Sequence, residues 1–146
     1  MKYFQGVKLQ RCQVHFMRNF LSKLAKKDQR EGMKLLRELF AATNRHHVME
    51  ILEEVLFFLE ERKKSSLIQW LEENIEDTLV VLSLPYEHRK QMKSTNMIER
   101  VNQEIKRRTK PIRIFPNDDS CLRMVATLCQ EISEGWGSRK YLPMNV

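Results

Sequence analysis

One stretch of the chain, from Ser94 to Lys110, combines a carboxylate with a dense group of cations. The carboxylate is Glu99, and the cations that follow it are Arg100, Lys106, Arg107, Arg108, Lys110 and Arg113. Arginine grips phosphate with two parallel hydrogen bonds, and Mg²⁺ commonly takes one or two carboxylates together with substrate phosphates. The stretch therefore holds the residue types that metal-dependent cutting and joining of DNA requires.

Glu99 also has a purely structural interpretation. Asn96 and Glu99 have the spacing of a capping box, and the helix macrodipole favours carboxylates in a first turn. One carboxylate does not build a two-metal site by itself. Taken alone, Glu99 favours the capping role, and the residues leave the metal-binding role open.

A helix over residues 94–108 is expected to position these groups. Its apolar stripe consists of Ile98, Val101 and Ile105. Its polar stripe consists of Glu99, Asn102, Gln103 and Lys106. One face of this helix is expected to pack, and the other is left for polar contacts.

The rest of the chain predicts a mainly α fold, a bundle of about five to seven helices with at most one short N-terminal strand. Only 4 Gly and 4 Pro among 146 residues favour helices, because straight side chains lose little rotamer freedom there. Residues 7–11 alternate apolar and polar side chains, which is consistent with the strand. The first expected helix covers residues 12–27, the second begins at Asp28 with Glu31, and the third is capped by Asn44. A further helical run extends from Ser65 or Ser66 to Leu82. The last helix is capped by residues in the range Asn117 to Ser120. Pro85 interrupts the helical pattern, and residues 110–116 are expected to be extended.

Composition and charge bound the function. The hydrophobic fraction of 42% suffices for a core, and no window approaches the roughly 20 apolar residues that cross a bilayer. The three cysteines lack the spacing of a disulfide framework, so a cytoplasmic protein without membrane contact is expected. Residues 87–113 hold nine Lys or Arg against three acids, whereas residues 45–86 hold four against nine. A basic segment suits a polyanion, but charge alone favours solvated helix faces.

Cys12 and His15 have the spacing of half a zinc site. No second pair follows, because Cys121 and Cys129 lie eight residues apart on an expected core stripe. A buried Cys and a hydrogen-bonded His that hold the start of the first helix are the preferred interpretation.

Three blocks of the sequence resemble one known family. They are Gln10 to Asn19, Ser94 to Lys110, and Ile114 to Asn117. In order and spacing they are similar to the C-terminal part of bacterial mutator-type insertion-sequence transposases, which are DDE recombinases with an RNase H-like catalytic core. The resemblance is weakest between about residues 28 and 84, where the family carries a variable helical insertion.

The resemblance implies roles for individual residues. It places the catalytic, Mg²⁺-binding Glu of the family on Glu99 and the family's C-x-x-H signature on Cys12 and His15, for structural support or DNA contact. For a chain of this kind, DNA binding is expected of Arg89, Lys93, Asn96, Arg100, Asn102, Lys106, Arg107, Arg108, Lys110 and Arg113. The family's two catalytic Asp precede the first block, and here only nine residues do, none of them acidic.

The chain is therefore expected to be a truncated piece of a transposase. Residues 1–27 would belong to the catalytic core, residues 28–84 to the helical insertion, and residues 85–146 to the Glu-bearing and C-terminal helices. Such a piece is expected to bind DNA weakly, to cut nothing alone, and to self-associate through the apolar surface that the missing sheet would cover. The alternatives are a stand-alone helical DNA-binding or regulatory protein that associates with full-length transposase, and an interaction bundle that uses the acidic third helix and binds no DNA.

Overall fold

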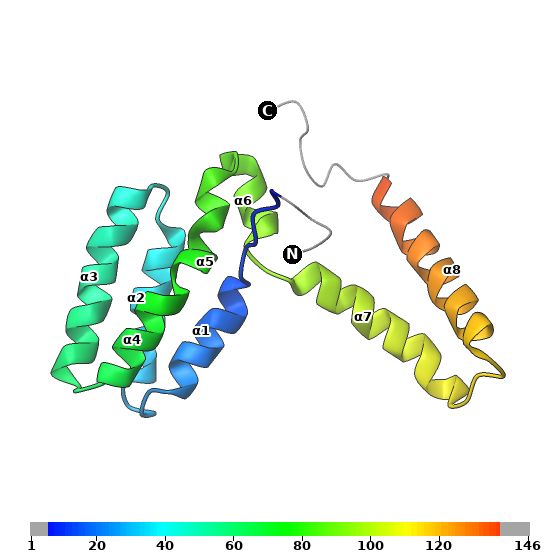
Figure 1. Cartoon of the computed structure of the whole chain (residues 1–146), viewed down its shortest axis with the longest axis horizontal. Helices are drawn as coiled ribbons and strands as arrows, with labels where there is room; N and C mark the ends of the chain where they lie inside the picture. The colour runs from blue at the N-terminus through cyan, green and yellow to red at the C-terminus, as the bar shows by residue number, and fades with distance from the viewer. Residues whose placement is uncertain (1–5, 138–146) are drawn as a thin grey trace. The chain divides into compact units, whose positions relative to one another are not determined.

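The computed structural model describes residues 6–137, and the chain divides into two compact units, Met1–Ser94 and Thr95–Val146 (Figure 1). In unit 1 the helices are α1 (Gln13–Ser22), α2 (Gln29–Ala41), α3 (Arg45–Glu61), α4 (Ser65–Asn74), α5 (Glu76–Leu79), the 3₁₀ turn η1 (Val80–Ser83) and α6 (Tyr86–Met92). In unit 2 they are α7 (Asn96–Thr109), the 3₁₀ turn η2 (Lys110–Ile112) and α8 (Asp118–Gly137). The expectation of a mainly α fold is confirmed.

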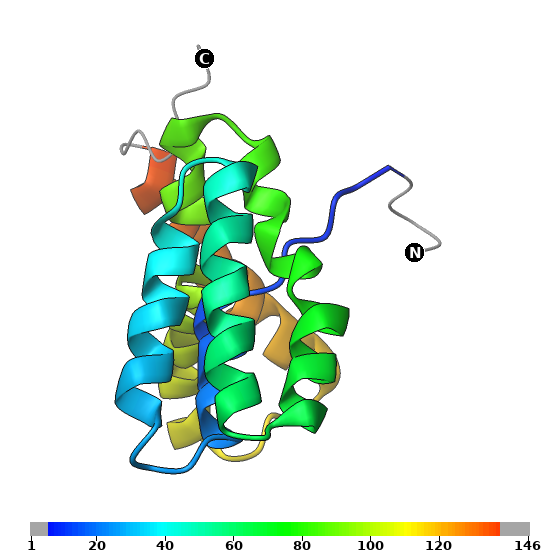
Figure 2. The same cartoon turned by 90° about the vertical axis from the view of Figure 1, so that its left-hand side faces the viewer.

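Unit 1 is an up-and-down bundle in which α1 to α4 reverse direction at short connections (Figures 1 and 2). Phe16 and Phe20 of α1 are fully buried in its core. The ring of Phe16 stacks on Trp70 of α4 with a centroid distance of 4.9 Å and meets the edge of Phe40 of α2 at 5.9 Å. One residue thus joins three helices. The first helix ends at Ser22 rather than at residue 27.

The pairing of α2 with α3 supplies most of the remaining core. Leu36 and Leu39 of α2 are fully buried, as are Val48, Val55 and Leu59 of α3. These residues recur at the spacing of three and four that places side chains on one helix face. Asn44 caps α3 as predicted, since its side-chain oxygen accepts a hydrogen bond from the His47 amide at 2.9 Å.

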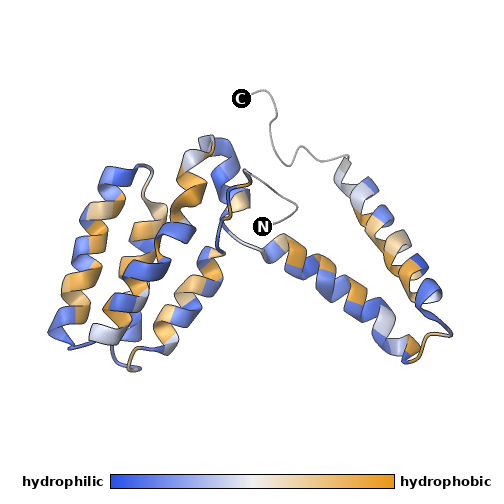
Figure 3. Cartoon of the chain, viewed as in Figure 1, coloured by the Kyte–Doolittle hydropathy of each residue, from blue (hydrophilic) through white to orange (hydrophobic). Residues whose placement is uncertain are grey.

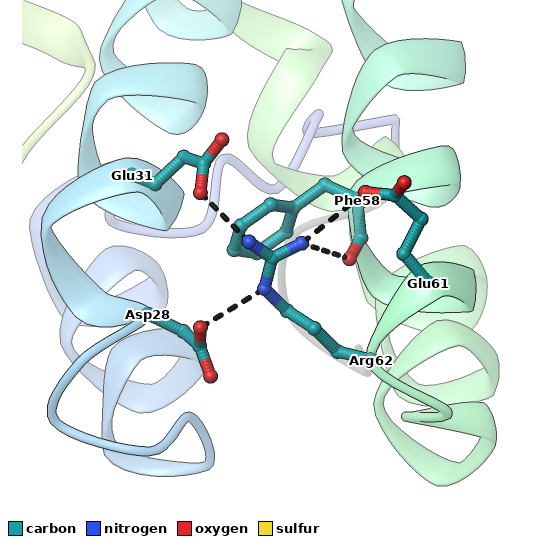
Figure 4. Close-up of polar contacts among 5 residues, drawn as sticks. All are labelled: Asp28, Glu31, Phe58, Glu61 and Arg62. Carbon is teal, nitrogen blue, oxygen red and sulfur yellow. Dashed lines mark hydrogen bonds and ion pairs between the residues drawn. The ribbon is translucent and has the colours of Figure 1, made fainter.

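The guanidinium of Arg62 links the end of α3 to the start of α2 (Figure 4). It donates to Asp28 at 3.0 Å and to Glu31 at 2.8 Å, and it lies 3.8 Å from the centroid of the Phe58 ring. The prediction that Asp28 caps α2 with its side chain is wrong, because that carboxylate makes no cap hydrogen bond. It is used for the ion pair with Arg62 instead.

Residues 7–11 do not form a strand, and no strand occurs anywhere in residues 6–137. A strand needs a partner to accept its ladder of hydrogen bonds, and this segment bonds to helices instead. The Arg11 amide donates to the carbonyl of Asp77 at 2.8 Å, and the Gln10 side chain bonds to both the carbonyl of Thr78 and the amide of Val81. The alternating pattern therefore reflects an extended segment clamped along α5 and η1.

Unit 2 pairs the helices α7 and α8, both of which carry hydrophobic as well as hydrophilic residues (Figure 3). Leu128 of α8 is its only buried apolar side chain among the described residues. Ile98, Ile114 and Leu122 are 63%, 85% and 65% exposed. Asn117 caps α8 through the Ser120 amide at 2.8 Å, as predicted. Residues 110–116, expected to be extended, instead begin with the turn η2. None of the described helices is long and apolar enough to span a membrane.

The C-terminus of α3 places Lys63 in a left-handed backbone conformation. It has a φ of +53°, and its amide and that of Lys64 bond back to the carbonyls of Glu60 and Leu59 at 2.9 and 3.0 Å. This is a Schellman motif with lysine where glycine is favoured. Lys63→Gly is expected to raise the free energy of unfolding by about 1 kcal/mol, because the left-handed conformation is costly for a residue with a Cβ.

The measurement is urea-induced unfolding followed by Trp70 fluorescence in a Trp136→Phe background. Lys64→Gly is the matched control, since Lys64 has an ordinary φ of −97° and glycine there should lower stability. Equal effects of the two substitutions would contradict the assignment.

Candidate nucleic-acid interface

Glu99 lies in the first turn of α7 and is half-buried. The hydroxyl of Thr95 donates to its carboxylate at 2.6 Å. The helix begins at Asn96, and Thr95 is the N-cap residue. The predicted capping box that begins at Asn96 is therefore wrong, because Asn96 is already the first helical residue. Thr95 fixes the orientation of the Glu99 carboxylate instead.

The candidate interface consists of the exposed cations of α7 and of the residues after it that form no ion pair in the described structure. They are Arg100, Lys106, Lys110 and Arg113, and none of them has an ion pair or side-chain hydrogen bond within residues 6–137. Asn96 and Asn102 of the same helix are also exposed. These side chains are available to a polyanion without first breaking a contact. We call the four cations the basic face as a name for the set, although Arg100 and Lys106 lie about 120° apart around the axis of α7.

Arg107 and Arg108 differ from the basic face because both bond to Glu104. Arg107 donates two hydrogen bonds to that carboxylate, at 2.9 and 2.6 Å, and Arg108 donates one at 3.1 Å. The hydrogen bonds from Arg107, and next those from Arg108, lower the pKa of Glu104 to about 2. Glu104 was absent from the residues expected to act at this site, although its spacing of three and four from the two arginines is a signal for such pairs.

Arg89 and Lys93 belong to unit 1, in and after α6. The guanidinium of Arg89 donates to three backbone carbonyls, those of Thr43, Leu84 and Leu82, at 2.7, 2.9 and 3.0 Å. Arg89 thus holds α6 against η1 and the loop before α3. Lys93 has an exposed side chain, and its carbonyl accepts the Gln13 amide at 3.0 Å.

Cys12 and His15 lie at the start of α1. Cys12 is buried at the N-cap position, and His15 is exposed one turn later. Across the described residues no three His, Cys, Asp or Glu side chains gather as a metal site would require. Glu99 therefore offers one carboxylate, and the described residues do not fit a complete Mg²⁺ site.

The structure is a two-unit helical protein in which α7 carries exposed cations and one oriented carboxylate. The family model described as "Transposase, Mutator family" matches residues 1–139. The chain belongs to the mutator family of transposases.

Individual relatives agree with this assignment. The chain is 42% identical over 139 residues to a transposase for insertion sequence element ISRM5 of Rhizobium meliloti (strain 1021), a match that covers 93% of the chain and 34% of that protein. It is 34% identical over 144 residues to the transposase for IS256 in transposon Tn4001 of Staphylococcus aureus, covering 97% of the chain and 37% of the relative. It is 36% identical over 143 residues to a transposase for IS406 of Burkholderia multivorans (strain ATCC 17616 / 249), covering 96% and 36%.

The chain thus spans about a third of the length of these relatives. No solved structure matches it significantly.

The hydrogen bonds that Glu104 accepts from the two arginines predict how its pKa responds when either arginine is replaced. Arg107→Gln is expected to raise the pKa of Glu104 from about 2 toward the ordinary value of about 4.3, and Arg108→Gln to raise it less, because Arg107 donates the larger share of hydrogen bonds. The depressed pKa means that this contact contributes to stability above the ordinary carboxyl pKa and is lost as pH falls through about 2.

NMR titration of the Glu104 side chain measures this directly. Arg123→Gln on α8 is the control for loss of one positive charge in the same unit. If Glu104 had the same pKa in the Arg107→Gln and Arg123→Gln variants, the hydrogen bonds from Arg107 would not be what lowers it.

Proposed function

We propose that this chain is the C-terminal, DNA-binding portion of a mutator-type transposase, and that it binds the DNA backbone through the basic face. The observation that carries the proposal is the exposure of Arg100, Lys106, Lys110 and Arg113 without partners in the described structure. The chain's membership of the mutator family and the transposase names of its relatives support the choice of DNA as the polyanion. Residues 28–84 then correspond to the helical insertion, residues 1–27 to part of an RNase H-like catalytic core, and residues 85–146 to the Glu-bearing and C-terminal helices.

Binding by the basic face would be electrostatic and independent of base sequence. Each phosphate that Lys or Arg neutralises releases condensed counterions, which makes the affinity fall steeply with salt. Asn96 and Asn102 add neutral donors that contact phosphate or sugar oxygens. Such contacts fix the register of DNA on α7 rather than its sequence.

Glu99 would be the one carboxylate that this chain contributes to a DDE-type site. Thr95 orients that carboxylate at 2.6 Å, and Arg100 is the next residue. A metal-dependent reaction needs further carboxylates aimed at the same ion within tight tolerances. The described residues hold no such set, so we expect no cleavage of DNA by this chain alone.

Neutralising the basic face tests the proposal. Arg100→Gln, Lys106→Gln and Lys110→Gln combined are expected to weaken duplex binding about tenfold or more at moderate salt and to reduce the slope of log affinity against log salt by about 2 to 3. Fluorescence anisotropy with a labelled duplex over a salt series gives both quantities.

The matched control removes three cations from an exposed face of α2. Arg30, Lys34 and Arg37 are three exposed cations at spacings of four and three residues, and Lys34 lies 3.9 Å from the Glu38 carboxylate. Arg30→Gln, Lys34→Gln and Arg37→Gln combined should therefore leave the slope nearly unchanged. Equal losses in the two variants would mean that binding follows total charge, and the basic face would have no special role.

We also propose that the chain self-associates through the apolar side chains of unit 2. Ile98, Leu122 and Trp136 are 63%, 65% and 43% exposed, and unit 2 has little core of its own. Exposed apolar clusters of this kind usually mark contacts. Another copy of the chain is the occupant proposed for this surface.

Sedimentation velocity at micromolar concentration tests self-association. The wild-type chain is expected to sediment as a dimer or larger species, and Leu122→Glu to shift it toward the monomer, because a carboxylate is costly to bury in an apolar contact. Glu131→Gln on the same helix is a control that leaves apolar surface intact. A wild-type monomer across the concentration range would refute this proposal.

A further inference from the structure

Unit 1 contains a cavity of about 570 Å³ that the proposed function leaves unused. Its floor is apolar and includes the buried side chains of Leu39, Val48 and Val81. Its rim is formed by α6. The volume is in the range of pockets that enclose small organic ligands.

One face of α6 points its side chains at this cavity. Tyr86, Lys90 and Lys93 all line it, and their spacing of four and three residues places them on the same side of the helix. Arg89 fixes that side, because its guanidinium bonds to the carbonyls of Thr43, Leu82 and Leu84. The rim is therefore held by hydrogen bonds rather than loosely attached.

The chemistry of the rim selects a flat ring joined to an anion. Tyr86 is 67% exposed, and the Arg89 guanidinium lies 5.9 Å from its ring centroid, so a large aromatic surface is presented in a fixed place. Lys90 and Lys93 are exposed and have no side-chain partner within residues 6–137. Glu87 also lines the cavity and offsets one of these two charges. An apolar floor, an aromatic wall and two cations match a nucleobase with its phosphate.

We propose that this cavity receives a single unpaired base of DNA, which stacks on Tyr86 while its phosphates contact Lys90 and Lys93. The proposal rests on the DNA-binding function proposed above. A base inside an intact duplex is covered on both faces by its neighbours and cannot enter a pocket. The site therefore distinguishes distorted DNA from continuous duplex.

The experiment compares two duplexes that differ only at one position. One carries a single extruded adenosine as a bulge, and the other carries an abasic bulge with the same backbone charge. The whole chain is expected to bind the adenosine bulge about tenfold more tightly, the usual contribution of one stacked base. Tyr86→Ala should abolish this ratio, and Tyr86→Phe, which keeps the aromatic ring, should retain it.

The lysines are tested by charge. Lys90→Gln with Lys93→Gln should weaken binding to both bulged duplexes, and Lys26→Gln with Lys27→Gln, an exposed pair elsewhere in unit 1, is the matched control. Equal wild-type affinity for the adenosine and abasic bulges would overturn the cavity proposal. If the wild-type protein showed no preference for the adenosine bulge but still bound continuous duplex, the cavity proposal would fail and the proposed function of the basic face would stand. If it bound none of the DNAs, both proposals would fail.

Discussion

Burial of the aromatic face of α1 is the constraint on which the helical bundle depends. Phe16 has no exposed surface and contacts both Trp70 and Phe40 through its ring. Removing a buried Phe costs about 3 to 5 kcal/mol, a large part of the 5 to 15 kcal/mol that typically stabilises a domain. Because α1 is fixed, the Gln13 amide reaches the carbonyl of Lys93 at 3.0 Å. The end of α6 is therefore positioned by a hydrogen bond from α1, and the core packing fixes the position of α1.

Arginine has different roles in this chain, and its neighbours decide between them. Arg62 and Arg89 donate hydrogen bonds to protein oxygens and hold helices together. Arg107 is occupied by Glu104 on the same helix. Arg100 has no such neighbour in the described structure and keeps its hydrogen-bonding capacity for a ligand. Net charge therefore overstates the surface available to DNA, because a guanidinium that already donates to protein oxygens must break those bonds to bind phosphate.

The helices were predictable from sequence because their signals are local. Asn44 and Asn117 cap their helices as the sequence predicts. The errors concern residues whose partners are distant in sequence. Asp28 looks like a cap but pairs with Arg62, and residues 7–11 look like a strand but bond to α5 and η1. The basic face was predicted only as a set of cations, although the spacing of Glu104 from Arg107 and Arg108 is the sequence signal that separates these two paired arginines from the others. The cavity at α6 had no sequence signal, because its floor comes from several helices.

The charge of α3 would restrict where the proposed DNA ligand can bind. Its exposed face carries Glu50, Glu53 and Glu60 around Phe57, which is 62% exposed. Carboxylates within a Debye length of about 10 Å repel a phosphate backbone at moderate salt. DNA is therefore disfavoured on this side of unit 1 although the chain as a whole has a charge of +7. In the proposed complex the cations of α6 and α7 would attract the DNA backbone and the carboxylates of α3 would repel it. The distribution of charge, more than its sum, would then determine which surfaces a polyanion contacts.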